Sequence, residues 1–220
     1  MKRLRNHGLT LFFFLLFLAT LVGQALVGHA AYNQEQQMSG SPTVPLASYL
    51  VGPDFSADVA ENWQSEYLQF FLLIMLTVWL VQKGSSESKK PGDEGFESDE
   101  EQKVGRFAGP DSPRWARAAG WRLGLYSHSL GLLMGVLFLG SWFAQSVAGH
   151  AAYNAQREEA GMQAWSWLKY VSEPDFWNRS LQNWQSEFLA VTSMTVFAIF
   201  LRERGSSESK KVGSPHEAHE

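Results

Sequence analysis

The sequence predicts an all-α integral membrane protein, a four-helix bundle built from two parallel tandem repeats of a two-helix unit. Three observations lead to this prediction: motifs that recur at one fixed spacing, long apolar runs that contain no charged residue, and basic residues concentrated on alternate sides of those runs. Aromatic residues make up 14% of the chain and include nine tryptophans. Such a content suits helices that cross two membrane interfaces.

Four motifs occur twice, and the members of each pair lie 121 positions apart. They are Gly-His-Ala-Ala-Tyr-Asn at 28–33 and 149–154, Pro-Asp-Phe at 53–55 and 174–176, Asn-Trp-Gln-Ser-Glu at 62–66 and 183–187, and Gly-Ser-Ser-Glu-Ser-Lys-Lys at 84–90 and 205–211. A constant spacing without gaps indicates a duplication. We therefore divide the chain into repeat 1 (1–90), a cytoplasmic linker (91–122), repeat 2 (123–211) and a disordered tail (212–220).

The first membrane span of each repeat is predicted at about residues 9–28 and 129–149. The uncharged run Leu9–Val27 covers about 28 Å at 1.5 Å per residue, which is close to the hydrocarbon thickness of a bilayer. In the second repeat, Gly131 and Gly135 form a GxxxG pattern, a common helix-packing motif in membranes. We expect this stripe to pack the first spans of the two repeats together, although small residues are also common in membrane helices that make no such contact.

The second span of each repeat is predicted at about residues 63–82 and 184–202, after outer loops at 29–62 and 150–183. The apolar parts of these spans are short, about 21–23 Å as helix. To cross the membrane, each span must therefore include part of the preceding Asn-Trp-Gln-Ser-Glu motif.

Lysine and arginine set the predicted orientation. Lys2, Arg3 and Arg5 precede the first run, loop 28–66 has no basic residue, and the stretch 83–122 has eight. By the positive-inside rule, both termini and the linker are cytoplasmic. A basic start before an apolar run also fits a cleaved signal peptide, but the Gly-His-Ala that ends this run ends the internal copy too, which favours a retained span.

Four polar residues fall at one depth in the predicted spans: Gln24, Glu66, Gln145 and Glu187. Each lies about 22 Å from the inner edge of its span, several ångströms below the outer surface. A carboxylate at that depth is costly and is usually paired or facing a cavity. We interpret the set as an outward-facing polar site for a proton or cation. The competing interpretation is a Glu–Gln pair that only fixes helix register, or a Glu that sits among lipid headgroups.

The Gly-His-Ala-Ala-Tyr-Asn motif supplies secondary candidates that share one helical face at i, i+3 and i+4. They are His29, Tyr32 and Asn33 with their copies His150, Tyr153 and Asn154. Two histidines and two carboxylates would suit a transition metal, so a metal- or quinone-dependent membrane enzyme is one alternative. Hydrogen-bonded surface histidines are the simpler interpretation. The chain has no cysteine and no nucleotide-binding or hydrolase motif, so we predict no enzyme activity, metal or cofactor.

The leading functional hypothesis is a small channel or transporter-like protein. The alternative from another class is a structural or adaptor protein. Its contacts with a cytoplasmic partner, or with a second copy of the chain, would lie at 84–90, 114–122 and 205–211. Both hypotheses assign the lipid bilayer as the main partner and exclude nucleic acid.

The repeated Gly-His-Ala-Ala-Tyr-Asn, Asn-Trp-Gln-Ser-Glu and Gly-Ser-Ser-Glu-Ser-Lys-Lys elements also carry a resemblance. With them, the chain resembles a family of small bacterial multi-pass membrane proteins of unknown function. The resemblance covers nearly everything except the linker and the tail. It implies a place in the bacterial cytoplasmic (inner) membrane, and it supplies no activity.

Overall fold

The computed structural model describes residues 6–218, which form seven α-helices, two 3-10 helices and no strand. The predicted all-α class is therefore confirmed, while the basic flank Lys2, Arg3 and Arg5 lies outside the described residues. In chain order the elements are α2 (Gly8–Ser39), α3 (Leu46–Leu50), α4 (Pro53–Leu76), η1 (Gly105–Phe107), η2 (Arg114–Arg117), α5 (Trp121–Ser127), α6 (Ser129–Glu159), α7 (Trp167–Val171) and α8 (Pro174–Phe200).

Internal contacts divide the chain into two compact units. The first comprises Met1–Ala60 and Ala144–Val171, and the second comprises Glu61–Phe143 and Ser172–Glu220. Each unit contains segments of both sequence repeats, and α4 and α6 each run from one unit into the other.

Among residues 6–218, two helices, α2 and α6, are long and apolar enough to cross a membrane. Every residue of the most apolar stretch of α2 is at least partly exposed. Helices α4, with 24 residues, and α8, with 27, are long enough, but neither contains a stretch that is as apolar as a candidate span needs. In α4 the helix ends at Leu76, so only Tyr67–Leu76 is both helical and apolar, about 15 Å. Two candidate spans, rather than four, are what the helices themselves provide.

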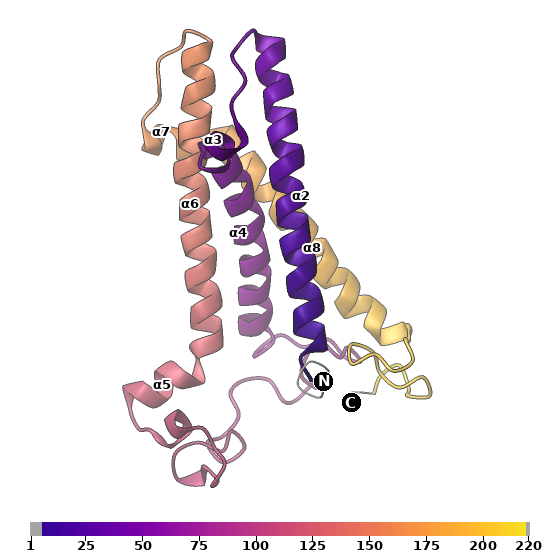
Figure 1. The fold of residues 1–220 in the computed structure, drawn as a ribbon. Helices are drawn as coiled ribbons and strands as arrows, with labels where there is room; N and C mark the ends of the chain where they lie inside the picture. Colours follow the sequence, from indigo (N-terminus) through magenta and orange to yellow (C-terminus); the bar gives the residue numbers. More distant parts are fainter. Residues whose placement is uncertain (1–5, 219–220) are drawn as a thin grey trace. The chain divides into compact units, whose positions relative to one another are not determined.

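The first unit contains two similar helical corners. Helix α2 continues past Gly28 to Ser39, a loop turns back, and α3 follows; α6, its loop and α7 repeat this path (Figure 1). Gly40 ends α2 with a φ of 77°, and Gly161, its copy, has a φ of 70° after α6. Glycine tolerates this left-handed conformation, and the chain past it bonds back to the last helical turn. The repeated glycine therefore sets where both helices stop.

In the second unit, α4 packs against α6 through the GxxxG glycines. A Cβ atom at Gly131 would lie 2.9 Å from Met75 Sδ, and one at Gly135 would lie 3.2 Å from the Phe71 ring. The sequence predicts that this stripe contacts the first span of the other repeat. The structure places it against α4 instead, because the short apolar part of α4 presents large side chains that need small neighbours.

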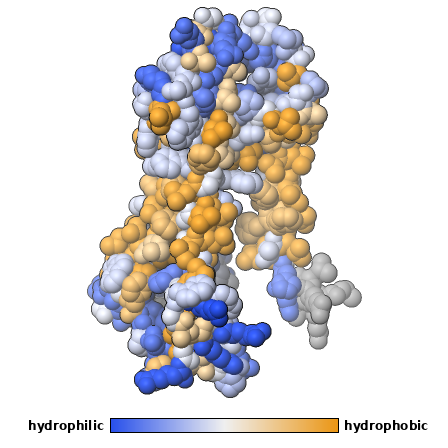
Figure 2. Space-filling view, turned by 90° about the vertical axis from the view of Figure 1, so that its left-hand side faces the viewer, coloured by the Kyte–Doolittle hydropathy of each residue, from blue (hydrophilic) through white to orange (hydrophobic). Residues whose placement is uncertain are grey.

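Aromatic side chains join α6 to α8 in the same unit. Trp142 packs against Phe176, Trp177 and Trp184, with ring centroids 5.6–6.0 Å apart. Its indole N–H donates to Ser180 Oγ at 3.2 Å. Hydrophobic residues also cover broad parts of the exposed surface (Figure 2). The unit thus has a small interior and much apolar surface.

Candidate functional site

In the first corner, Asn33 clamps the backbone of Val44. Its Oδ1 accepts the Val44 N–H at 2.8 Å, and its Nδ2 donates to the Val44 carbonyl at 3.0 Å. His29 Nε2 lies 2.8 Å from the same carbonyl oxygen. Because a carbonyl oxygen only accepts, this nitrogen must carry a proton and donate. The loop is therefore held to α2 by three hydrogen bonds.

The second corner repeats the clamp with the same geometry. Asn154 Oδ1 accepts the Trp165 N–H at 2.9 Å, and its Nδ2 donates to the Trp165 carbonyl at 2.9 Å. His150 Nε2 lies 2.7 Å from that oxygen. The bonds are to backbone groups, so the clamp works on Val44 and Trp165 alike although their side chains differ.

A tyrosine closes each corner, and sequence reasoning missed it. Tyr49 is 5% exposed, and its ring packs against His29, Tyr32 and Phe55 with centroids 5.5–5.8 Å apart. Its hydroxyl occupies the space beside Gly28, where a Cβ would collide with it. Burial, followed by the nearby charges of Asp58 and Asp54, raises the pKa of Tyr49.

The copy of this tyrosine is Tyr170, which is also buried. It packs against His150 and Tyr153, and its hydroxyl lies beside Gly149. The signal was available, since Tyr49 and Tyr170 are identical residues at the repeat spacing, in segments that share little else besides Gly40 and Gly161.

The histidine, tyrosine and asparagine of each Gly-His-Ala-Ala-Tyr-Asn motif, the secondary candidates, are all used in contacts within the corners. Both histidines use Nε2 as a donor to the backbone, so that nitrogen offers no lone pair to a metal. Within residues 6–218, no three His, Asp or Glu side chains are grouped so that they could hold a metal ion. The Gly-His-Ala-Ala-Tyr-Asn motif therefore builds a corner.

The structure brings two of the four primary candidates together. Glu66 on α4 lies close enough for its charge to act on the Glu187 carboxyl on α8, and Ser65, whose hydroxyl donates to the Asn62 carbonyl at 2.9 Å, lies near Glu187. Glu187 is half-buried, Glu66 is exposed and Ser65 is buried. Two carboxylates that act on each other, with a hydroxyl near them, form a candidate site for a proton or a cation.

Gln64, two residues before Glu66 in α4, is a buried polar residue that the sequence did not single out. It is 0% exposed, and its Oε1 accepts the indole N–H of Trp184 at 2.7 Å. Its Nε2 has no hydrogen-bond partner within residues 6–218. A buried amide donor without a partner costs on the order of 2 kcal/mol or more, so such groups usually bind water or a ligand.

Gln145, one of the predicted candidates, is also buried with its side-chain amide unpaired, and it belongs to the first unit. It is 2% exposed, and neither its Oε1 nor its Nε2 has a partner in the described part of the chain. Its copy Gln24 is only half-buried on α2. Gln24 and Gln145 belong to the first unit, and Glu66 and Glu187 belong to the second.

An ion pair joins α4 of the first repeat to α8 of the second, and the copies of its two residues cannot form it. Arg179 Nη1 donates to Glu61 at 3.0 Å, and Asn183 Nδ2 donates to the other oxygen of Glu61 at 2.7 Å. The copies of Glu61 and Arg179 are Gln182 and Asp58, so the second repeat cannot form the same pair in reverse. The divergence at these positions was the only sequence signal.

The heptapeptide Gly-Ser-Ser-Glu-Ser-Lys-Lys forms the same turn in both repeats. Its glycine has a φ of 85° at Gly84 and 89° at Gly205. Ser88 Oγ accepts the backbone N–H of Gln82 at 2.8 Å. In the second repeat Ser209 Oγ accepts the backbone N–H of Glu203 at 2.9 Å. These internal bonds give the glycine and the third serine of each heptapeptide a structural role.

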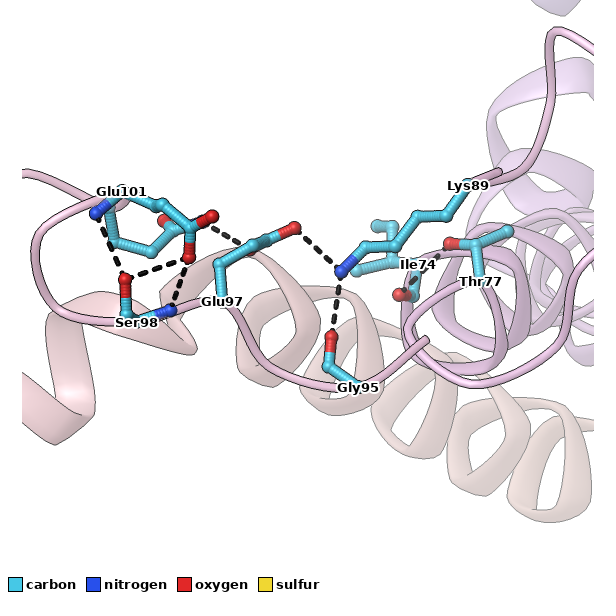
Figure 3. A network of polar contacts seen from close by, with 8 residues as sticks. Ile74, Thr77, Lys89, Gly95, Glu97, Ser98 and Glu101 are labelled. Carbon is cyan, nitrogen blue, oxygen red and sulfur yellow. Dashed lines mark hydrogen bonds and ion pairs between the residues drawn. The ribbon is translucent and has the colours of Figure 1, made fainter. Parts of the chain in front are cut away.

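The first lysine of each heptapeptide holds neighbouring backbone. Lys89 bonds to Glu97 at 2.6 Å and to the Gly95 carbonyl at 2.7 Å (Figure 3). Its copy Lys210 is 3% exposed and donates to the carbonyls of Gly84 and His216 at 2.6 and 2.7 Å. Lys210 thereby ties the turn of one repeat to that of the other.

Because Lys210 joins the two turns, Glu87 of the first heptapeptide lies close enough to Glu208 of the second for their charges to interact. Burial, and then the charge of Glu208, raises the pKa of Glu87 above its ordinary value. A raised pKa means that folding favours the neutral acid. Its stabilising contribution is therefore complete below the unfolded pKa, about 4.3, and is lost as the pH rises through the folded pKa.

We expect Glu87→Gln to raise the melting temperature at pH 7 and to leave it unchanged near pH 4, where the wild-type carboxyl is also neutral. Thermal unfolding in detergent across this pH range measures the difference. Glu100→Gln removes an exposed linker carboxylate as the control. An equal effect of Glu87→Gln at both pH values would contradict the assignment.

The comparisons with known proteins give one match. The family model described as a domain of unknown function, DUF6766, matches residues 1–220. The chain belongs to this family. No curated protein and no solved structure matches it. Membership of the DUF6766 family brings no activity with it, so function has to be inferred from the side chains and their contacts.

Proposed function

We propose that the chain is a four-span protein of the bacterial cytoplasmic membrane that passes protons or small cations through a site centred on Glu66 and Glu187. The acidic pair is the observation that carries the proposal. In water two adjacent carboxylates repel each other only weakly, whereas in an apolar setting they must share a proton or bind a cation.

Several features support a membrane setting. Helix α2 and much of α6 expose large apolar side chains that water would not tolerate over such an area. Helices α4 and α8 complete the four spans if the Asn-Trp-Gln-Ser-Glu motifs lie within the bilayer. The basic residues of the linker and the C-terminal flank then face the cytoplasm.

The linker has a segment suited to the cytoplasmic membrane surface. Trp121 at the start of α5 is 72% exposed, and the Arg122 guanidinium lies 5.6 Å from the centre of its ring. Trp115 on η2 is also exposed. Exposed tryptophan with arginine is typical of helices that lie among lipid headgroups.

The groups around the acidic pair favour a cation over an anion. Glu66 and Glu187 supply negative charge, and the Ser65 hydroxyl, which donates to the Asn62 carbonyl, keeps an oxygen that can accept from water or contact a cation. The unpaired Nε2 of Gln64 requires an acceptor, which a water molecule would supply. Hydrated protons and small monovalent cations suit a site of this composition.

Reconstituted liposomes test the proposal. We expect proton or monovalent-cation flux in the wild type, and flux no greater than that of empty liposomes after Glu66→Gln with Glu187→Gln. Glutamine keeps the side-chain size and removes the charge. The matched control, Glu35→Gln with Glu158→Gln, removes two exposed carboxylates from other parts of the chain and should keep wild-type flux.

Two results would overturn the proposal: a double variant that conducts like the wild type, or a wild type that conducts neither ion. Circular dichroism on the same samples verifies that helix content is unchanged, so lost flux is not confused with unfolding.

A further inference from the structure

A cavity of about 300 Å³ lies between α4 and α8 in the second unit. It begins at Gln69 and Phe188, directly after the acidic pair, and ends at Glu87 and Ser88 of the first heptapeptide turn. Leucine and valine side chains line much of its wall. Its volume has room for on the order of ten water molecules at about 30 Å³ each.

We propose that this cavity is a water-filled vestibule through which protons or small cations reach the Glu66–Glu187 pair from the cytoplasm. The inference rests on the proposed function and deepens it, because it assigns the route on one side of the site. It places Glu87 at the cytoplasmic mouth.

The early end of α4 supports water in the cavity. The predicted span runs to about residue 82, but the helix stops at Leu76, and the non-helical residues Thr77, Leu80 and Val81 line the cavity wall. The N–H groups of Thr77 and Leu80 still bond to the Leu73 and Leu76 carbonyls, but that of Val81 has no hydrogen bond within residues 6–218. A backbone group without such a bond is not tolerated against lipid, and it occurs at membrane depth only where protein or water surrounds it. A lipid-filled crevice would leave this backbone without water.

Polar side chains from α8 also face the cavity. Thr192 and Thr195 line it one turn apart. Within residues 6–218 neither hydroxyl has a hydrogen bond, whereas the hydroxyl of Thr77 is bonded to the Leu73 carbonyl at 2.7 Å. Free hydroxyls in an otherwise apolar wall are suited to hold water along a path between two acidic ends.

The charge at the mouth fits a cation route. Glu87 lines the cavity, and the carboxylate of Glu208 is close enough to act on it. A cleft whose mouth carries charge of one sign raises the local concentration of the opposite ion and speeds its entry by about tenfold or more.

The absence of cysteine from the chain makes a direct test practical. In Thr195→Cys the new thiol is the only one, and water-soluble thiosulfonate reagents report whether water reaches it. We expect modification in inside-out vesicles and none in right-side-out vesicles. Phe197→Cys, on the far side of α8 at a similar depth and outside the cavity wall, is the matched control and should resist both.

Charge selectivity gives a second measurement. A cationic reagent should modify Thr195→Cys about tenfold faster than an anionic reagent of the same size. Adding Glu87→Gln and Glu208→Gln should remove most of this preference without abolishing modification.

Three outcomes would overturn the vestibule: modification only by a membrane-permeant maleimide, which indicates lipid in the crevice; modification from the outer side; or equal rates for both charges. Accessibility is measured without transport, so failure of the two proposals can be told apart. A vestibule that is reached by water in a protein without flux would refute the proposed function alone.

Discussion

Gly28→Ala is expected to destabilise the chain by about 1–3 kcal/mol, the usual cost of overpacking, and Tyr49→Phe in the same chain is expected to restore most of the loss. A Cβ at this position would collide with the Tyr49 hydroxyl. The ring cannot easily move aside, because it is buried among three other rings. Phenylalanine removes the colliding atom and keeps the packing.

The matched control is Gly23→Ala on the same helix, where nothing lies within 4 Å of the added Cβ. Alanine is the better helix former by about 0.5–1 kcal/mol, so this control should be neutral or stabilising. Thermal unfolding of both single variants and of the Gly28→Ala, Tyr49→Phe double variant completes the cycle. Simple additivity of the two changes would contradict the predicted contact.

Asn33→Ala is the second substitution with a large expected effect. It removes both hydrogen bonds to Val44 and leaves the N–H and part of the carbonyl capacity unmet, at about 1–2 kcal/mol for these half-buried groups. The loop after α2 should then open locally. Hydrogen exchange at the Val44 amide is the direct measurement, and it should become faster by at least about tenfold, which corresponds to 1.4 kcal/mol.

The repeat supplies a strong internal comparison for this variant. Asn154→Ala should accelerate exchange at Trp165 and leave Val44 unaffected, and the reverse should hold for Asn33→Ala. Gln34→Ala, at the exposed neighbouring position, should change neither amide. Unchanged exchange at Val44 in Asn33→Ala would show that the loop is held by other contacts.

Periodicity and repetition predict the helices well and their ends poorly. The run through Thr77–Val81 is as apolar as the helix before it, so composition gives no reason to stop at Leu76. The change is local: the Trp79 N–H bonds to the Leu76 carbonyl three residues back, and a β-branched pair, Thr77 and Val78, follows the last regular turn. Such a change of hydrogen-bond pattern becomes visible only when the atoms are placed.

The candidate site, too, was predicted only in part from the sequence. Depth counting selected Glu66 and Glu187, and the structure places these two near each other. Depth counting could not select Gln64. Which residue of the Asn-Trp-Gln-Ser-Glu motif is buried depends on how α4 is rotated about its axis toward α8. The corner motif was found from identity between the repeats, but its purpose depends on Val44 and Tyr49, which lie outside the motif.

The Glu61–Arg179 pair has a consequence for how such a protein can be assembled. Two copies of the first repeat, joined in the same way, would set Glu61 against Asp58 and place acid beside acid. Two copies of the second would set Arg179 against Gln182 and leave the cation without its carboxylate. Each half is therefore complementary to the other and not to itself. In one chain each first repeat is made together with one second repeat, so the two complementary halves are always present in equal number. Separate genes for the two halves would not ensure this.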